Sequence, residues 1–310
     1  MTYLIISPCR NEAEYMRNTL DTVIAQSVLP AKWIIVNDGS TDDTSKILKE
    51  YQAKYKWIEI VNRENRGNRS VGPGVIEAFY EGLDKESIDN FDFICKLDLD
   101  LRLPEKYFET LINRMNDNPR IGTCSGKPYM VLADGKIVAE KCDSEMSVGA
   151  SKFYRTDCFK EIGGFVRRVM WDAIDCHRCR MYGWIACSWD DVPDLQFIHL
   201  RPMGSSQNGI LTGRMRHGYG QYYMGTGIIY ITAAAANRIL HPPLIIGGLA
   251  VMWGYLRSML LREERIDDKK FIKFIRKYQW QALLKGKQKA VENINNEQKV
   301  VWEQRKVTQI

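Results

Sequence analysis

Two aspartates, Asp98 and Asp100, stand one residue apart near the end of an apolar run, in the segment KLDLDLRLP of residues 96–104. Apolar runs of this kind usually form buried strands, and buried strands avoid carboxylates. Alternate residues of a strand point to the same side, so we expect the two carboxylates to point together, with Lys96 beside them in an ion pair. Such close like charges repel unless they are neutralised, and Mg²⁺ or Mn²⁺ does this while also binding substrate phosphate. We therefore interpret the pair as a metal site; the plain alternative is that the strand ends here and both side chains are solvated.

The elements around this motif alternate between strands and helices through the first hundred residues. The predicted strands are residues 3–7, 33–38, 57–62 and 91–100, and helical spacing follows each of the first three. Such alternation indicates a mostly parallel α/β sheet, in which ligands bind at the carboxyl ends of the strands. Polar segments occur at those ends, namely PCRNE (8–12), NDGS (37–40) and the two aspartates.

The composition is that of an ordinary globular protein, and its charge is unevenly placed. The chain has 310 residues, 45% hydrophobic and 26% charged, which is enough for one large domain or two ordinary ones. The net charge is +6, and residues 262–310 alone hold thirteen Lys/Arg against seven Asp/Glu. This tail is either a solvated helical surface or a face for anionic lipid. Eight cysteines without the spacing of a secreted domain indicate reduced thiols in a cytosolic protein, and the first residues are typical of a strand rather than a signal peptide or anchor.

The last hundred residues differ from the rest. They are apolar, aromatic and glycine-rich, but the apolar stretch 243–256 is too short for a spanning helix, which needs about twenty residues. We expect helices that lie in a membrane interface, or that pack as a helical subdomain or dimer interface. Residues 206–310 are accordingly predicted to be a helical region. Residues 1–205 are predicted to be the catalytic domain, with a donor nucleotide half (1–100) and an acceptor half (101–205).

Four segments, in this order, resemble the family 2 glycosyltransferases, which are inverting enzymes of the GT-A fold. They are SPCRNEAEYMRNTLDTVIAQS (7–27), IIVNDGSTDDT (34–44), CKLDLDLRLP (95–104) and GGFVRRVMWDAIDCHRCRMYGW (163–184). The resemblance covers roughly residues 3–200. It implies an α/β nucleotide-diphosphate-sugar binding sandwich of the GT-A type, with a mostly parallel central sheet and a helical C-terminal region.

The resemblance also implies roles for individual residues. Glu12 and Asp38 would contact the nucleoside, since a carboxylate can accept from a uracil N–H or from ribose hydroxyls. Asp100 would be the principal metal contact, and Asp98 would lie near the ribose or in the water shell of the metal. Further donor contacts are expected from Pro8, Asn11, Arg66, Gly67 and Arg69.

His199 ends the strand LQFIHL, where related enzymes often have a histidine that helps to hold the metal or the diphosphate. A satisfied structural histidine is the alternative. We interpret the loop with Arg66 and Arg69 as a binding loop, whose guanidinium groups contact the diphosphate or the base. The alternative is that this loop is simply solvated.

The catalytic base is assigned by spacing against the family pattern E-D-x-D-L-x-x-R-x-x-x-x-G. Asp172 lies six residues before Arg178 and eleven before Gly183, as the pattern requires, although Trp171 replaces the usual Glu. Asp172 is therefore the predicted base, and Asp175 becomes the base if the register is shifted.

These assignments predict an inverting, metal-dependent transfer of a single sugar from a nucleotide-sugar, with a UDP-sugar favoured. The acceptor would be a hydroxyl of a glycan or lipid-linked saccharide in polysaccharide or cell-envelope biosynthesis. A processive synthase is disfavoured because the Q-x-x-R-W motif and multiple spans are absent from the sequence. The alternatives are a phosphatase of the haloacid dehalogenase type, an inactive nucleotide-sugar-binding protein and a sugar nucleotidyltransferase. We expect no nucleic acid among the partners of this protein. The protein is expected to be cytoplasmic, and both a homo-oligomer and peripheral attachment to the inner face of the membrane are compatible with the sequence.

Overall fold

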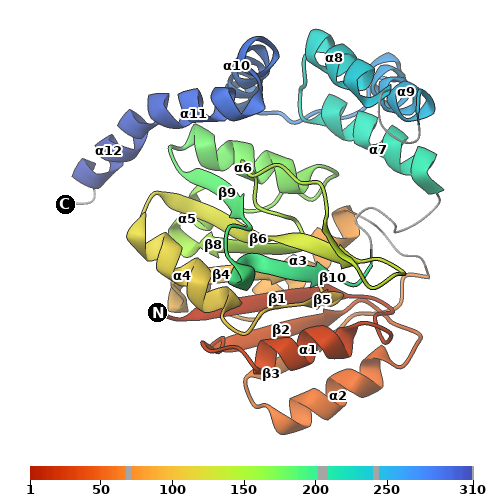
Figure 1. Cartoon of the computed structure of the whole chain (residues 1–310), viewed down its shortest axis with the longest axis vertical. Coiled ribbons are helices and arrows are strands. Elements are labelled where there is room, and N and C mark those ends of the chain that lie inside the picture. Colours follow the sequence, from red (N-terminus) through yellow and green to blue (C-terminus); the bar gives the residue numbers. More distant parts are fainter. Residues whose placement is uncertain (68–71, 202–208, 240–243, 309–310) are drawn as a thin grey trace. The chain divides into compact units, whose positions relative to one another are not determined.

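The computed structural model describes residues 1–67, 72–201, 209–239 and 244–308 (Figure 1). The described residues of the chain form two compact units. The first comprises Met1–Phe165 with Ile185–Met203, and the second Val166–Trp184 with Gly204–Ile310. Residues 166–184, which the predicted catalytic domain of residues 1–205 includes, belong to the second unit.

The first unit is built on a sheet whose described strands number ten. The strands are β1 (Tyr3–Cys9), β2 (Lys32–Asn37), β3 (Ile58–Asn62), β4 (Phe93–Leu97), β5 (Leu101–Arg102), β6 (Ile121–Val131), β7 (Ile137–Ala139), β8 (Ser151–Arg155), β9 (Ile185–Trp189) and β10 (Gln196–His199). Their order is β3-β2-β1-β4-β8-β6-β10-β5, with β7 and β9 also paired to β6. Strands β3, β2, β1 and β4 are mutually parallel, so the predicted parallel half is confirmed; β8 is antiparallel to both β4 and β6.

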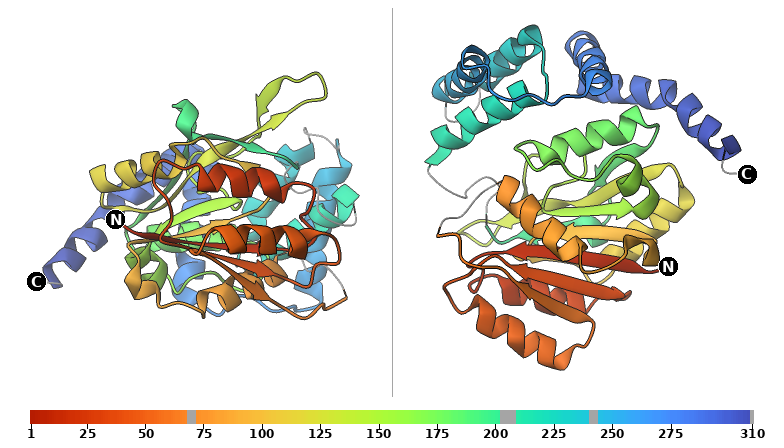
Figure 2. Two further views of the ribbon diagram at one scale, coloured as in Figure 1. Left: turned by 90° about the horizontal axis from the view of Figure 1, so that it is seen from below. Right: turned by 180° about the vertical axis from the view of Figure 1, so that it is seen from behind.

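Helices cover both faces of the parallel half, which is why its strands are apolar on both sides (Figures 1 and 2). The helices of this unit are α1 (Met16–Ile24), α2 (Thr44–Lys54), α3 (Pro73–Leu83), α4 (Tyr107–Asp117) and α5 (Thr156–Glu161), with short 3₁₀ turns at Ile88–Asn90 and Pro193–Leu195. Tyr3 and Ile5 of β1 lie in one core with side chains of α1, α2 and α4. On the opposite face, Gly82 of α3 lies against the methyl groups of Ile6 and Val36.

The strand register brings the carboxyl ends of the parallel strands to one edge of the sheet. Cys9 at the end of β1 pairs with Asn37 at the end of β2, which in turn pairs with Asn62 at the end of β3. The chain segments that follow these strands, and the segment that follows β4, therefore begin at the same edge. This is where the sequence predicted the polar groups to gather.

Strand β4 is shorter than predicted, and this corrects the argument for the two aspartates. The strand ends at Leu97, so Asp98 and Asp100 lie in the bend that joins it to β5. The alternation of a strand therefore does not set their directions, and the strand argument for their pointing together was wrong, although the two carboxylates lie close enough to interact. The main chain leaves the sheet where the apolar run meets its first carboxylate, since an ionised side chain is costly to bury between two layers.

The second unit is helical where it is described. It contains α6 (Trp171–Met181), α7 (Gly209–Tyr223), α8 (Ile228–Ile239), α9 (Ile246–Leu260), α10 (Lys269–Lys285), α11 (Lys287–Glu297) and α12 (Lys299–Thr308). One face of α10 is apolar and buried: Phe271, Phe274, Ile275 and Tyr278 are buried and Ala282 is partly buried. Among the described helices, none has the length and apolar character needed to cross a membrane.

Candidate active site

The carboxylate of Asp38, directly after β2, is buried and held by two guanidinium groups. Arg63 Nη1 donates to Oδ1 at 2.8 Å, and Arg66 Nη2 donates to Oδ2 at 2.6 Å. The main-chain N–H of Asp38 donates to the carbonyl of Cys9 at 2.8 Å, which fixes the residue to the end of β1. Arg66, expected at the diphosphate or base, thus lies beside the predicted nucleoside contact. Arg63 was not predicted, although it follows β3 at the same edge.

The other predicted residues of the loop after β3 are only partly covered by the structure. Gly67 has φ 76°, and its N–H donates to Asn65 Oδ1 at 2.8 Å. Arg69 lies outside the described residues. The contact of Gly67 with a donor stays a prediction.

The loop after β1 is tied to the turn after β2 by side-chain hydrogen bonds. Asn11 has φ 54°; its Oδ1 accepts from Thr41 N–H at 2.8 Å, and its own N–H donates to Ser40 Oγ at 3.0 Å. The N–H of Glu12 donates to Thr44 Oγ1 at 2.9 Å. Pro8 lies in β1 opposite Val36. The structure thus places Pro8, Asn11 and Glu12 next to the Asp38 segment, and Asn11 shapes the loop that carries Glu12.

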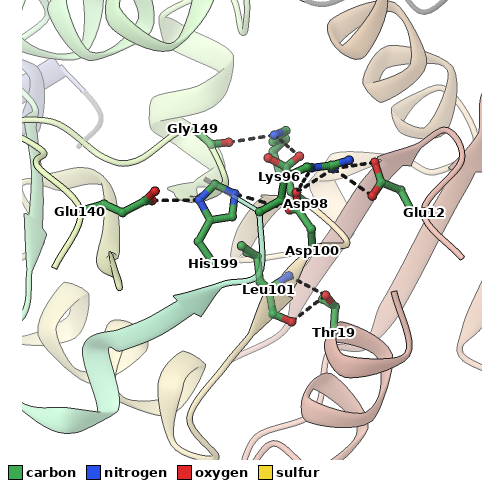
Figure 3. Close-up of polar contacts among 10 residues, drawn as sticks. Glu12, Thr19, Lys96, Asp98, Asp100, Leu101, Glu140, Gly149 and His199 are labelled. Atoms are coloured by element: carbon green, nitrogen blue, oxygen red, sulfur yellow. Dashed lines mark hydrogen bonds and ion pairs between the residues drawn. The ribbon is translucent and has the colours of Figure 1, made fainter. Parts of the chain in front are cut away.

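Asp98 lies directly beyond β4 and pairs with Lys96 (Figure 3). Lys96 Nζ donates to Asp98 Oδ1 at 2.5 Å and to the carbonyl of Gly149 at 2.8 Å. The expected ion pair of Lys96 is confirmed. The Asp98 side chain is 33% exposed, so it is the more open of the two aspartates. Burial and the neighbouring Asp100 raise the pKa of Asp98, against the effect of Lys96.

Asp100 is buried and contacts cations through both of its carboxylate oxygens. Arg201 donates to Oδ2 from Nε at 3.0 Å and from Nη2 at 2.7 Å. Oδ1 makes no hydrogen bond with any residue that the structure describes, and it lies 3.7 Å from Nε2 of His199. Burial alone would raise the pKa of Asp100, but His199 and Arg201 outweigh it and lower the pKa to about 2.

His199, the last residue of β10, lies between two carboxylates (Figure 3). Its Nδ1 is 3.0 Å from Glu140 Oε2, and its Nε2 faces Asp100. Burial would lower the pKa of His199, but Asp100 and Glu140 raise it to about 9. The structure therefore brings together His199 and Asp100, as the metal assignment requires, and adds Glu140, which was not predicted.

The donor set suits part of the coordination shell of a divalent cation. Asp100 Oδ1 is a buried carboxylate oxygen that lacks a hydrogen bond, and a histidine nitrogen faces it. Mg²⁺ and Mn²⁺ ordinarily complete such a shell with phosphate oxygens and water. Over the described parts of the chain, no three His, Cys, Asp or Glu side chains form a ready-made metal group, so protein ligands alone would not complete it.

Arg201 is another residue of the site that the sequence analysis missed, besides Arg63 and Glu140. Its Nη2 lies 2.9 Å from both Glu12 carboxylate oxygens, while the same group contacts Asp100. The only signal in the sequence was its position two residues after His199, at the end of a strand that was already assigned to the site. Glu140 gave no comparable signal, because it lies 59 residues from its partner and comes directly after the short strand β7.

The two candidate bases differ in exposure within the second unit. Asp172 is exposed in the first turn of α6, whereas Asp175 is 1% exposed and its Oδ1 accepts from Cys176 N–H at 2.6 Å. A base must reach the hydroxyl whose proton it accepts, so the exposure favours Asp172. Its role as base stays a prediction.

Comparison with known proteins identifies the class to which this fold and site belong. The solved structures similar to it include S. aureus TarS 1-349 in complex with UDP-GlcNAc (TM-score 0.52, 12% identity, 98% of this chain and 92% of that one). A mannosyltransferase from Pyrobaculum calidifontis in complex with GDP-Man and Mn²⁺ is similar as well (TM-score 0.52, 14% identity, 96% and 86%). The predicted GT-A type fold is confirmed by these neighbours.

The sequence comparison agrees with the predicted resemblance. Residues 4–131, less than half of the chain, match the family model for Glycosyl transferase family 2, which confirms the predicted resemblance of this part of the chain to that family. Its curated relatives include poly-beta-1,6-N-acetyl-D-glucosamine synthase of Staphylococcus aureus (strain COL), 27% identical over 128 residues, and that of Staphylococcus epidermidis, 28% identical over 120 residues. The matches cover 41% and 39% of this chain, and 28% and 27% of those proteins, so it spans little more than a quarter of their length. This family match leaves the phosphatase alternative without support.

Gly39 offers a test of how the turn after β2 is positioned. It has φ 65°, and a Cβ there would lie 2.4 Å from the Cα of Asn65, in the loop that carries Arg63 and Arg66. We expect Gly39→Ala to lower the free energy of unfolding of the first unit by about 2–4 kcal/mol, combining the backbone strain with the steric clash. Chemical denaturation would measure the loss.

Gly67→Ala is the matched control, since Gly67 also has a positive φ but no neighbour in the described part of the chain lies within 4 Å of its Cβ position. It should cost only the strain, about 1–2 kcal/mol. Equal losses in the two variants would contradict the close approach of the two loops.

Proposed function

We propose that this protein transfers a single sugar from a nucleotide-sugar, preferably a UDP-sugar, to a hydroxyl of a glycan or lipid-linked saccharide, in polysaccharide or cell-envelope biosynthesis. The transfer would be metal-dependent and would invert the anomeric configuration. The observation that carries the proposal is the convergence of Glu12, Asp38 and Asp100 at the carboxyl edge of one parallel sheet. Relatives solved with UDP-GlcNAc and with GDP-Man and Mn²⁺ support a nucleotide-sugar as the donor.

The nucleoside would be recognised by the acids at the ends of β1 and β2. Ionised carboxylates only accept hydrogen bonds, and the base N–H and the ribose hydroxyls of a nucleotide supply donors. Glu12 and Asp38 are both buried beyond the strand ends, so their contacts with a donor would be shielded from water. Arg66, which pairs with Asp38 at 2.6 Å, would donate to the diphosphate or the base of the same ligand.

Asp100 Oδ1 and His199 Nε2 would hold Mg²⁺ or Mn²⁺, with Asp98 close to its water shell. When bound, the ion supplies positive charge to the departing nucleoside diphosphate. The protein residues around it have separate tasks: Glu140 orients the imidazole of His199 through Nδ1, and Lys96 holds Asp98.

Asp172 would act as the general base for the acceptor. Its carboxylate would accept the proton of the acceptor hydroxyl while that oxygen attacks the anomeric carbon from the face opposite the leaving group. One displacement inverts the configuration, and no covalent bond to the enzyme forms. The exposure of Asp172 in the first turn of α6 supports this assignment over the buried Asp175.

The donor can be identified by thermal shift with UDP-, GDP- and dTDP-sugars, each with and without Mn²⁺, followed by mass spectrometry of the products. We expect stabilisation by one nucleoside diphosphate sugar that grows with Mn²⁺, and release of that nucleoside diphosphate. Binding without turnover towards any saccharide would favour the inactive nucleotide-sugar-binding alternative. Stabilisation by no nucleotide-sugar, with or without the metal, would refute the proposal.

Replacement of the candidate bases separates their roles. We expect Asp172→Asn to lower the rate of transfer by about 10²–10⁴-fold, the usual contribution of a general base, while the donor still binds. Asp175→Asn is the control: it tests the buried carboxylate that bonds to Cys176 N–H, and thermal unfolding reports any structural loss. If Asp175→Asn abolishes transfer in a folded protein and Asp172→Asn does not, the assigned register is wrong.

We further propose that the protein works at the cytoplasmic face of a membrane, attached through its second unit. Helix α9 is apolar nearly all round, and Arg257 is its only charged residue. Its inner face is buried, yet Ile246, Leu249, Trp253 and Leu260 of its outer face are each more than half exposed. An exposed apolar stripe of this kind is typical of interaction surfaces.

Charge favours an anionic lipid surface as the partner. From residue 196 to residue 262 the sequence contains no Asp or Glu but six arginines. Four of them, Arg214, Arg216, Arg238 and Arg257, lie on the helices α7, α8 and α9. Arginine and tryptophan beside exposed aliphatic residues are typical of helices that lie in the membrane interface.

Vesicle co-sedimentation tests this attachment. We expect binding to vesicles that contain phosphatidylglycerol, weaker binding to phosphatidylcholine alone, and a loss of at least about tenfold in the doubly substituted Leu249→Gln, Trp253→Gln protein. Leu29→Gln is the control, because Leu29 is 48% exposed and lies in the first unit. If the double variant instead turns a dimer into a monomer and leaves vesicle binding unchanged, the face is a contact between two copies of this chain.

A further inference from the structure

Arg201 ties together two acids that come from distant parts of the chain. Glu12 follows β1 and Asp100 follows β4, and the guanidinium group hydrogen-bonds to both carboxylates at 2.7–3.0 Å (Figure 3 shows both acids). These are the acids that the proposed function assigns to the nucleoside and to the metal. The Arg201 side chain thus contacts both the proposed nucleoside-binding acid and the proposed metal-binding acid.

Because of this contact, the two carboxylate oxygens of Asp100 have different surroundings. Oδ2 accepts two hydrogen bonds from Arg201, while Oδ1 is buried without a hydrogen bond and faces His199. A divalent cation on Asp100 would lie within a few ångströms of the guanidinium group, and like charges at that distance in a buried site repel strongly. Arg201 in this arrangement therefore opposes metal binding.

The backbone next to Arg201 is held by a hydrogen bond, whereas the Arg201 side chain is more exposed than the two acids that it contacts. Leu200 N–H donates to the carbonyl of Asp100 at 2.8 Å, which anchors the chain just before Arg201. The Arg201 side chain is 23% exposed, whereas Glu12 and Asp100 are 6% and 7% exposed. A rotation of the arginine side chain could therefore release both acids without any movement of the strands.

We infer that Arg201 is a positioning residue that couples donor binding to metal binding. This inference rests on the proposed function. The guanidinium group holds Glu12 and Asp100 until a diphosphate draws it away, since a diphosphate offers several charged acceptor oxygens. Glu12 then becomes available to the nucleoside, and Asp100 to the cation. The two ligands bind cooperatively, and by linkage each strengthens the other equally.

The test measures Mn²⁺ binding directly, by electron paramagnetic resonance of the free ion, without donor and with saturating UDP. Removal of the guanidinium group in Arg201→Met should tighten Mn²⁺ binding in the absence of UDP by about 10–100-fold, as expected from the loss of competing charged hydrogen bonds. UDP should tighten Mn²⁺ binding much more in the wild type than in the variant. Arg201→Lys, which keeps the charge but not the two-pronged contact, should lie between them.

Arg114→Met is the matched control, because Arg114 also pairs with an acid of the first unit, Asp191 at 2.8 Å, but not with the site. It should leave Mn²⁺ affinity unchanged, and thermal unfolding of all variants checks that they are folded. Mn²⁺ affinity that is unchanged in Arg201→Met, or Mn²⁺ binding by neither protein, overturns the coupling. Failure of the proposed function has a different signature, namely that no nucleotide-sugar binds or is turned over by the wild type.

Discussion

The interaction on which the rest of this structure depends is the repulsion among carboxylates at one edge of a sheet. Glu12, Asp38 and Asp100 are buried, and Asp98 is two-thirds covered. Unpaired charges in such surroundings would cost several kcal/mol each. Cations offset this cost: Arg63 and Arg66 at Asp38, Lys96 at Asp98, and Arg201 with His199 at Asp100.

The parallel sheet is what creates this crowding. Parallel strands in register end at the same edge, so each loop after a strand adds its polar groups to the same place. The pairing of Cys9 with Asn37, and of Asn37 with Asn62, aligns the ends of β1, β2 and β3. β10 then brings His199 and Arg201 to the aspartates, because it pairs antiparallel with β5 just beyond them. The acids thus come mainly from the first half of the first unit, and two of the cations come from its last strand.

Much of this arrangement could be predicted from the sequence, because it depends on local patterns. Apolar runs predicted β1 to β4, and the polar residues after them marked the edge. The carboxylates of Asp38 and Asp100 and the imidazole of His199 were placed correctly near strand ends. The period-two argument failed for Asp98 and Asp100 because the strand ends before them, at Leu97.

The pairings were harder to predict because they are not local. Arg201 contacts Asp100 across 101 residues and Glu12 across 189, and no pattern within one segment records such a contact. A rule based on charge would have helped, since buried carboxylates require partners and strand ends beside them are where cations must be sought. The grouping of residues 166–184 with the C-terminal helices is non-local in the same way, because it depends on apolar contacts such as that of Ile174 with the core that contains Phe271 and Tyr278.

The charge balance of the site limits what it can accept. The metal-free site contains four carboxylates and three basic side chains. The carboxylates are those of Glu12, Asp98, Asp100 and Glu140, and the basic side chains are Lys96, His199 and Arg201. In the absence of a metal, Asp100 and Glu140 raise the pKa of His199 to about 9, so a cation held by Nε2 would displace the imidazole proton. A cation alone would have to do so beside Lys96 and Arg201, and a diphosphate alone would enter beside the four carboxylates. The diphosphate of a nucleotide-sugar and a divalent ion together add no net charge, so the site favours the pair over either ligand by itself.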